Sequence, residues 1–93
     1  MIKSFRDKKT RMLFEERPVL RFRQIERGAR RKLLFLNQAK RLEDIAALPG
    51  NRLEKLFGDR KGQYSIRIND QWRICFRWEA GDVHDVEIVD YHP

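Results

Sequence analysis

Apolar and polar residues alternate strictly in the second half of the chain, in the stretch YSIRINDQWRICFRW at residues 64–78. The apolar side chains occupy even-numbered positions: Ile66, Ile68, Ile74, Phe76, Trp78. Arginine occupies three of the odd-numbered positions: Arg67, Arg73, Arg77. A period of two is typical of a strand with one buried face. The pattern therefore predicts two strands with an apolar inner face and an arginine-bearing outer face.

The first half of the chain has the wider apolar spacing of helices. Asp7 can cap a helix over residues 8–16, and Pro18 ends that segment. A longer helix is predicted over residues 22–39, because apolar residues recur at helical spacing: Ile25, Ala29, Leu33, Leu36. A short third helix is predicted over residues 42–48, before the sequence PGN.

Helices in the first half and strands in the second half predict an α+β domain. Strands are predicted at residues 52–57, 63–69, 72–79 and 83–91, with a short first strand at 1–5. We expect two N-terminal helices to pack on one face of a twisted, mainly antiparallel sheet of four to five strands. The whole chain, 1–93, is predicted to form this single domain.

Charge narrows the choice of partners. The net charge is +7 and most of it comes from arginine. Such an excess favours a polyanionic partner, which leaves nucleic acid, the ribosome, an anionic membrane surface and an acidic protein open. A single cysteine, Cys75, fits a reducing cytoplasm, and the sequence has no apolar run of transmembrane length and no signal peptide.

The turn between the two arginine strands sets their register. A three-residue turn centred on Asp70 keeps even positions opposite even positions, and it pairs Arg67 with Arg73 across the ladder. Like charges directly opposite are unfavourable, by a few tenths to about 1 kcal/mol. A turn centred on Gly81 in the next hairpin pairs Arg77 with Asp85 and places Arg73 opposite Val89. Arg77 therefore reads as structural, whereas Arg67 and Arg73 are suited to gripping a phosphate.

The outer face of the sheet therefore predicts a cluster of Arg67, Arg73 and Tyr91, with His92 at the strand end. The loop GDRKG adds Arg60 and Lys61 if it folds over that face. Such groups suit cleavage of RNA, in which the 2′-hydroxyl attacks the adjacent phosphorus and arginines stabilise the charge on the phosphoryl oxygens. No cofactor or metal is predicted, because the sequence has no metal-ligand spacing.

The stretch GDRKGQYSIRINDQWRICFRW, followed by VEIVDYH, resembles the HigB-type toxins of bacterial toxin–antitoxin systems, in the RelE/ParE superfamily. The opening MIKSF and the later LFE resemble the N-terminus of that family. The resemblance implies a RelE-like fold. It also implies a metal-independent endoribonuclease that cuts messenger RNA in the ribosomal A site and so inhibits translation and growth.

The resemblance carries the site over residue by residue. Arg67 and Arg73 match the family's arginines, and Tyr91 and His92 match its terminal tyrosine and histidine. The remaining implied RNA contacts are Arg60, Lys61, Asn69, Gln71, Trp72 and Lys55. Some HigB toxins carry histidine and lysine where this chain has Glu54 and Phe57, and loss of that lysine removes one phosphate contact. Two alternatives follow: a mild toxin, or one that relies more on Lys55 or Lys61.

The resemblance also implies partners. These are a HigA-type helix-turn-helix antitoxin, the ribosome with its message, and operator DNA through the antitoxin complex. The implied location is the cytoplasm, and no membrane partner is implied. One alternative is a non-catalytic, ParE-like toxin that binds DNA gyrase. Another is a weakened toxin that acts mainly as an antitoxin-bound co-repressor. The sequence DYH beside paired arginines favours RNA chemistry.

Overall fold

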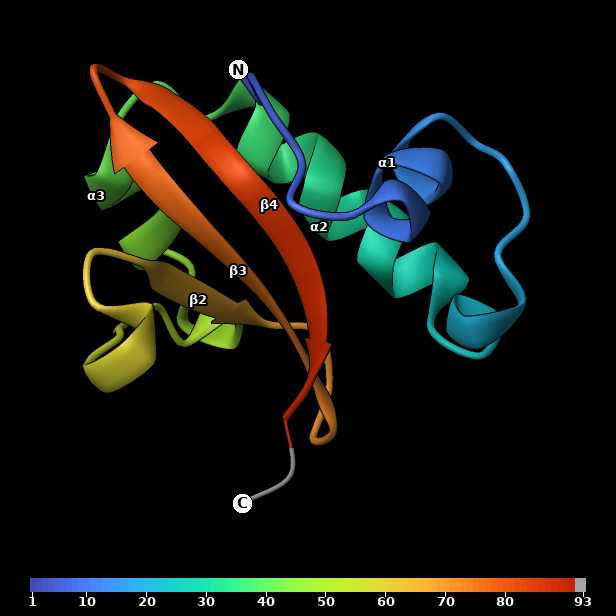
Figure 1. Ribbon diagram of the computed structural model, residues 1–93. Helices are drawn as coiled ribbons and strands as arrows, with labels where there is room; N and C mark the ends of the chain where they lie inside the picture. The colour runs from blue at the N-terminus through green and yellow to red at the C-terminus, as the bar shows by residue number, and fades with distance from the viewer. Residues whose placement is uncertain (92–93) are drawn as a thin grey trace.

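A four-stranded antiparallel sheet lies at the centre of the computed structural model, which describes residues 1–91 (Figure 1). The strands neighbour one another in chain order: β1 (Glu54–Lys55), β2 (Tyr64–Arg67), β3 (Trp72–Glu79), β4 (Asp82–Asp90). The described α-helices are α1 (Lys8–Phe14), α2 (Glu26–Gln38) and α3 (Leu42–Ala46). Short 3₁₀ turns lie between them: η1 (Leu20–Phe22), η2 (Pro49–Asn51), η3 (Gly58–Arg60). The predicted α+β class is confirmed, and no described helix is long and apolar enough to cross a bilayer.

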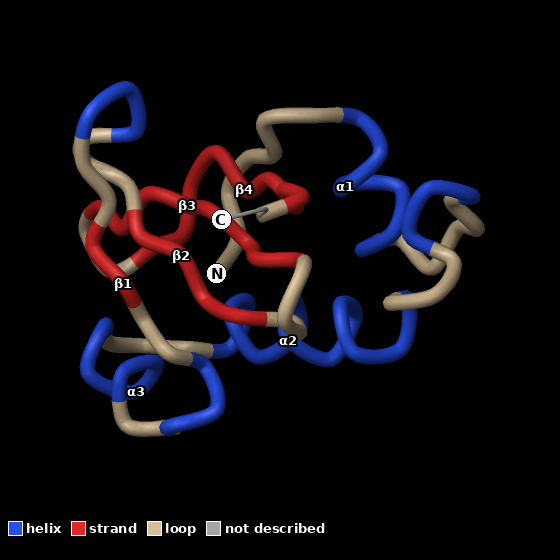
Figure 2. Tube along the Cα trace, turned by 90° about the horizontal axis from the view of Figure 1, so that it is seen from below, coloured by secondary structure: helices blue, strands red, loops and turns tan. Residues whose placement is uncertain are grey.

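The sheet separates two sides of the molecule. Figure 2 shows α2 and α3 on one side and the turn of η3, between β1 and β2, on the other. Alternation along β2 and β3 turns Ile66, Ile74 and Phe76 toward α2, where all three are fully buried. They pack with the apolar stripe of α2, which is Ala29, Leu33 and Leu36. We call the opposite side, which carries η3, the outer face.

The long helix is shorter than predicted. Residues 20–22 form the separate turn η1, and Ile25 has the non-helical angles φ −111° and ψ 5°. The helix α2 therefore begins at Glu26 rather than at residue 22. The strand predicted over 52–57 is likewise reduced to Glu54–Lys55, because Arg52 leaves the η2 turn in the left-handed conformation with φ 44°.

The N-terminal segment covers the free edge of β4. The strand predicted over residues 1–5 is reduced to two isolated parallel bridges, Ile2 with Val83 and Phe5 with Val86. Farther along the same edge, the Thr10 hydroxyl of α1 accepts a hydrogen bond of 3.1 Å from the Ile88 amide. These contacts satisfy backbone groups that an edge strand would otherwise expose.

The first hairpin has the predicted register, and the second does not. Arg67 pairs with Arg73, as the three-residue turn requires. In the second hairpin Glu79 pairs with Asp82, so its turn has two residues, Ala80 and Gly81, both with positive φ. Such turns match the twist of paired strands. Arg77 consequently lies opposite His84, so the predicted pairing with Asp85 is wrong.

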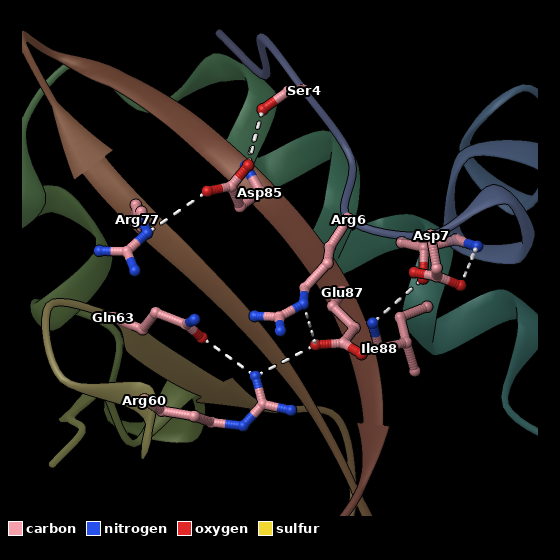
Figure 3. A network of polar contacts seen from close by, with 10 residues as sticks. Ser4, Arg6, Asp7, Arg60, Gln63, Arg77, Asp85, Glu87 and Ile88 are labelled. Atoms are coloured by element: carbon pink, nitrogen blue, oxygen red, sulfur yellow. Dashed lines mark hydrogen bonds and ion pairs between the residues drawn. The ribbon is translucent and has the colours of Figure 1, made fainter. Parts of the chain in front are cut away.

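A bulge restores the register farther along β4. Asp85 has φ 54° and lies where the pairing shifts between Cys75 and Arg77. Beyond it, Ile74 pairs with Ile88 and Arg73 with Val89, as predicted. The bulge also aims Asp85 at Arg77, whose Nε lies 3.3 Å from Oδ2 (Figure 3). The predicted ion pair is therefore present without the predicted register.

We expect Gly62→Ala to lower the free energy of unfolding by about 1–2 kcal/mol. Gly62 has φ +90°, and a Cβ built there lies 2.6 Å from Nη1 of Arg77. The matched control is Gly50→Ala, because a Cβ at Gly50 meets nothing within 4 Å. Urea denaturation measures both, and equal midpoints for the two variants would contradict this account.

Candidate functional site

A cleft of about 360 Å³ lies on the outer face, between β1, η3 and the C-terminal end of β4. Its lining residues are Glu54, Lys55, Leu56, Phe57, Asp59, Arg60 and Tyr91. Three of the residues predicted for RNA contact or catalysis thus meet in one cavity: Lys55, Arg60 and Tyr91. Glu54 and Phe57, where some HigB toxins carry histidine and lysine, line the same cavity.

Arg73 lies beside this cleft but is buried. Only 6% of the residue is exposed, so its expected exposure to solvent is wrong. Its Nε donates to the Ser65 hydroxyl at 2.8 Å, and Nη2 donates to the Arg52 carbonyl oxygen at 2.6 Å. The chain between η2 and β1 therefore covers this side chain. A buried guanidinium held by several acceptors has a fixed position.

The charge of Arg73 still reaches residues of the cleft. Its Cζ lies 5.5 Å from the centre of the Tyr91 ring, within the range of a cation–π contact. Its Nη2 lies 3.9 Å from Oε1 of Glu54. The predicted proximity of Arg73 and Tyr91 is therefore present, with the arginine beneath the ring rather than beside it in solvent.

Arg67 is the more accessible of the two paired arginines. Its side chain is 32% exposed and forms an ion pair with Asp70, which is almost fully exposed. Arg67 lies across the ladder from Arg73 and on the same face of the sheet. It is not among the residues that line the cleft. A joint grip of both arginines on one phosphate stays a prediction.

A polar network holds Arg60 at the wall of the cleft (Figure 3). Nη1 of Arg60 donates to Gln63 Oε1 and to Glu87 Oε1, both at 3.1 Å. Glu87 also lies 3.8 Å from Nε of Arg6, so one carboxylate links η3, β4 and the N-terminal segment. Arg60 is thereby positioned and partly neutralised. The neighbouring Lys61 is exposed and does not line the cleft.

The three predicted RNA contacts of the β2–β3 turn support the turn itself. Oδ1 of Asn69 accepts hydrogen bonds of 2.8 Å from the amides of Gln71 and Trp72. Gln71 Nε2 donates to Oδ2 of Asp90 at 3.2 Å. None of the three lines the cleft. Their contacts with RNA stay predictions, and His92 lies outside the described residues.

Two residues that the sequence analysis left out hold the site together. Ser65, fully buried, accepts from Arg73, and Glu87 accepts from Arg60. Both occupy the odd-numbered, outward positions that predicted the arginines. The predicted register could have identified them, because it places Ser65 and Glu87 on the strands to either side of Cys75.

Cys75 is expected to resist thiol reagents in the folded protein. The residue is 1% exposed, and its burial is the main reason why the pKa of the thiol is raised. The pKa of this thiol is higher in the folded protein than in the unfolded chain. The contribution of the buried, protonated thiol to the free energy of unfolding is therefore fully present below the unfolded-chain pKa, and it is lost as the pH rises through the folded-state pKa. Labelling with iodoacetamide should follow global unfolding in urea. Rapid labelling without denaturant would contradict the burial, and Cys75→Val is the unlabelled control.

A family model described as the RelE-like toxin of type II toxin–antitoxin system HigB matches residues 3–92. The chain belongs to the HigB-like toxin family. Toxin HigB-1 of Vibrio cholerae serotype O1 is 40% identical over 83 residues, which is 87% of each chain. Endoribonuclease HigB of Proteus vulgaris is 31% identical over 100 residues, covering 99% of this chain and 100% of the relative.

Solved structures agree with the fold of this HigB-like toxin. Two structures of the YoeB–YefM toxin–antitoxin complex from Staphylococcus aureus contain a chain that matches it with TM-scores of 0.58 and 0.59. Each match covers 100% of this chain and 99% of the other at 18% identity. At that identity the likeness concerns the fold alone. The family assignment and the RelE-like fold predicted from the sequence are confirmed.

Proposed function

We propose that this HigB-like toxin is an endoribonuclease that cuts messenger RNA bound to the ribosome. The observation that carries the proposal is the cleft at which Lys55, Arg60 and Tyr91 meet above the buried Arg73. A cavity whose lining offers two cations beside two carboxylates, together with an ionisable ring, can hold a phosphodiester next to a proton-transfer group. The name of the Proteus vulgaris relative, an endoribonuclease, supports the same reaction.

The reaction needs two proton transfers at one phosphorus. The RNA 2′-oxygen bonds to the adjacent phosphorus as its proton passes to a base, and the bond from phosphorus to the 5′-oxygen breaks as an acid protonates that oxygen. The products are a 2′,3′-cyclic phosphate and a 5′-hydroxyl. We assign these transfers to Tyr91 and His92, and we assign charge stabilisation on the phosphoryl oxygens to the arginines.

The two paired arginines are suited to different parts of that task. Arg67 can exchange its exposed partner Asp70 for a phosphate at little cost, because exposed ion pairs contribute only about 0–1 kcal/mol. Arg73 is already held by Ser65 and Arg52. Its positive charge acts on the site from beneath the Tyr91 ring, 5.5 Å from the ring centre.

The basic surface of α2 suits docking on ribosomal RNA. Arg23, Arg27 and Arg31 are exposed in and just before this helix. Clustered guanidinium groups attract a polyanion over long range and accelerate its binding. We also assign to the toxin a HigA-type helix-turn-helix antitoxin, repression of the operon through operator DNA bound by the complex, and action in the cytoplasm.

Mapping the 5′ ends of cellular RNA after induction tests the proposal. Wild type should produce new ends within translated messages, and Arg67→Ala should remove them while the protein stays folded. Arg17→Ala is the matched control, because Arg17 is another exposed arginine near a carboxylate, 3.9 Å from Glu15. Unchanged RNA ends during growth inhibition would sink the nuclease proposal. Inhibition of gyrase supercoiling by the purified toxin would then favour the ParE-like alternative.

A further inference from the structure

Phe57 is an exposed aromatic side chain on the wall of the cleft. It is 76% exposed, and Tyr91, which lines the same cleft, is 43% exposed. The other phenylalanines of the chain are buried in the core or packed against it: Phe5, Phe14, Phe22, Phe35, Phe76. A flat apolar ring left in solvent beside a cavity forgoes the stabilisation of burial. Unlike a single exposed side chain, Phe57 shares its cleft with a second exposed ring, Tyr91, and two aromatic surfaces that line one cavity can be covered by a single ligand.

The charged side chains around Phe57 favour different positions in the cleft for the phosphate and the base of a nucleotide. Glu54 and Asp59 place carboxylates in the lining of the cleft, and Lys55 and Arg60 place cations there. A phosphate among the carboxylates would be repelled, whereas an uncharged base would not. The phosphates of a strand therefore favour positions next to the Lys55 and Arg60 side chains over positions next to Glu54 and Asp59. The part of the substrate left for the exposed ring is the base.

We propose that Phe57 and Tyr91 hold one unstacked nucleobase of the RNA in this cleft. The inference rests on the proposed endoribonuclease function and deepens it by assigning a base-binding residue. Single-stranded RNA is commonly bound through bases that stack on aromatic side chains, and every base has a face that can stack. Holding one base against Phe57 fixes which phosphate lies next to the pair of Tyr91 and Arg73.

The test uses ribosomes programmed with a defined message whose A-site codon contains 2-aminopurine, a base whose fluorescence responds to stacking. Wild-type toxin should change this fluorescence and cut the message. Phe57→Leu keeps an apolar side chain but removes the flat ring. We expect it to lose the fluorescence change and to lower kcat/KM roughly tenfold, with a smaller effect on kcat. Phe57→Trp keeps a flat ring and should retain both signals.

The control variant is Leu20→Ala in η1, because Leu20 is 83% exposed and lies outside the cleft. Wild-type fluorescence change and cleavage by Phe57→Leu would overturn the inference. So would a Phe57→Leu variant that only binds its antitoxin more weakly, since that result would make Phe57 a protein contact. The fluorescence reads stacking whether or not the message is cut. A wild type that changes the signal without cutting therefore contradicts the nuclease proposal alone and supports the stacked base.

Discussion

Arg73→Ala is expected to lower the free energy of unfolding by about 2–4 kcal/mol. The substitution leaves the buried Ser65 hydroxyl and the Arg52 carbonyl oxygen without their donors, and it empties a site in which the arginine is 6% exposed. It also removes the cation beneath Tyr91, so cleavage should fall even among the molecules that remain folded.

Two further variants separate the structural effect of Arg73 from its effect on the reaction. Arg77→Ala is the matched control, because Arg77 is an arginine of β3 whose side chain is 35% exposed and whose ion pair with Asp85 is at the surface. It should cost at most about 1 kcal/mol. Arg73→Lys keeps the charge without the planar fork. Urea denaturation measures stability, and cleavage rates are compared at equal folded fraction. An unchanged unfolding midpoint for Arg73→Ala would contradict the burial described here.

Trp72→Ala is expected to lower the free energy of unfolding by about 2–4 kcal/mol. The Trp72 ring packs edge-on against Phe22, with ring centres 5.6 Å apart, and Cζ of Arg21 lies 5.4 Å from its centre. The ring therefore joins the start of β3 to the η1 turn that precedes α2. Loss of this contact removes apolar burial and a cation–π interaction together.

Trp72→Phe provides the comparison, since a smaller ring keeps the edge-on contact. Its cost should be less than half that of the alanine variant, as measured by thermal unfolding. If Trp72 acts through packing, Trp72→Phe cuts messages at the wild-type rate. A stable Trp72→Phe variant with lost cleavage would instead support the RNA contact implied by the family resemblance.

The sequence predicts which face of the sheet each strand residue occupies. It does not predict whether an outward side chain reaches solvent. The alternation from Tyr64 to Trp78 correctly separates core positions from outward positions and sets the register of Arg67 opposite Arg73. It does not reveal what covers the outward face. Arg73 is buried because the backbone at Arg52 lies over it, and that contact spans 21 residues with no periodic signal. Local patterns report which face a residue occupies, not which distant loop lies on it.

The second hairpin shows a further limit. Simple parity predicts a turn centred on Gly81, whereas the chain forms a two-residue turn and inserts Asp85 as a bulge. The two solutions give the same register beyond the bulge, so the pairing of Ile74 with Ile88 does not distinguish them. The sequence pattern did not predict the cleft either. The position of η3 at its wall depends on the ion pair of Arg60 with Glu87, and these residues are 27 positions apart in the chain.

The contact of residues 1–10 with β4 affects how the protein is made. Ile2, Phe5 and Thr10 have their partners at Val83, Val86 and Ile88, so these residues are synthesised well before the residues with which they pair. Translation proceeds at roughly 5–20 residues per second, which leaves the opening segment unpaired for several seconds. The native fold is therefore completed only after β4 has emerged from the exit tunnel. A nascent chain that stalls before Val83 lacks the β4 residues with which its N-terminal segment pairs.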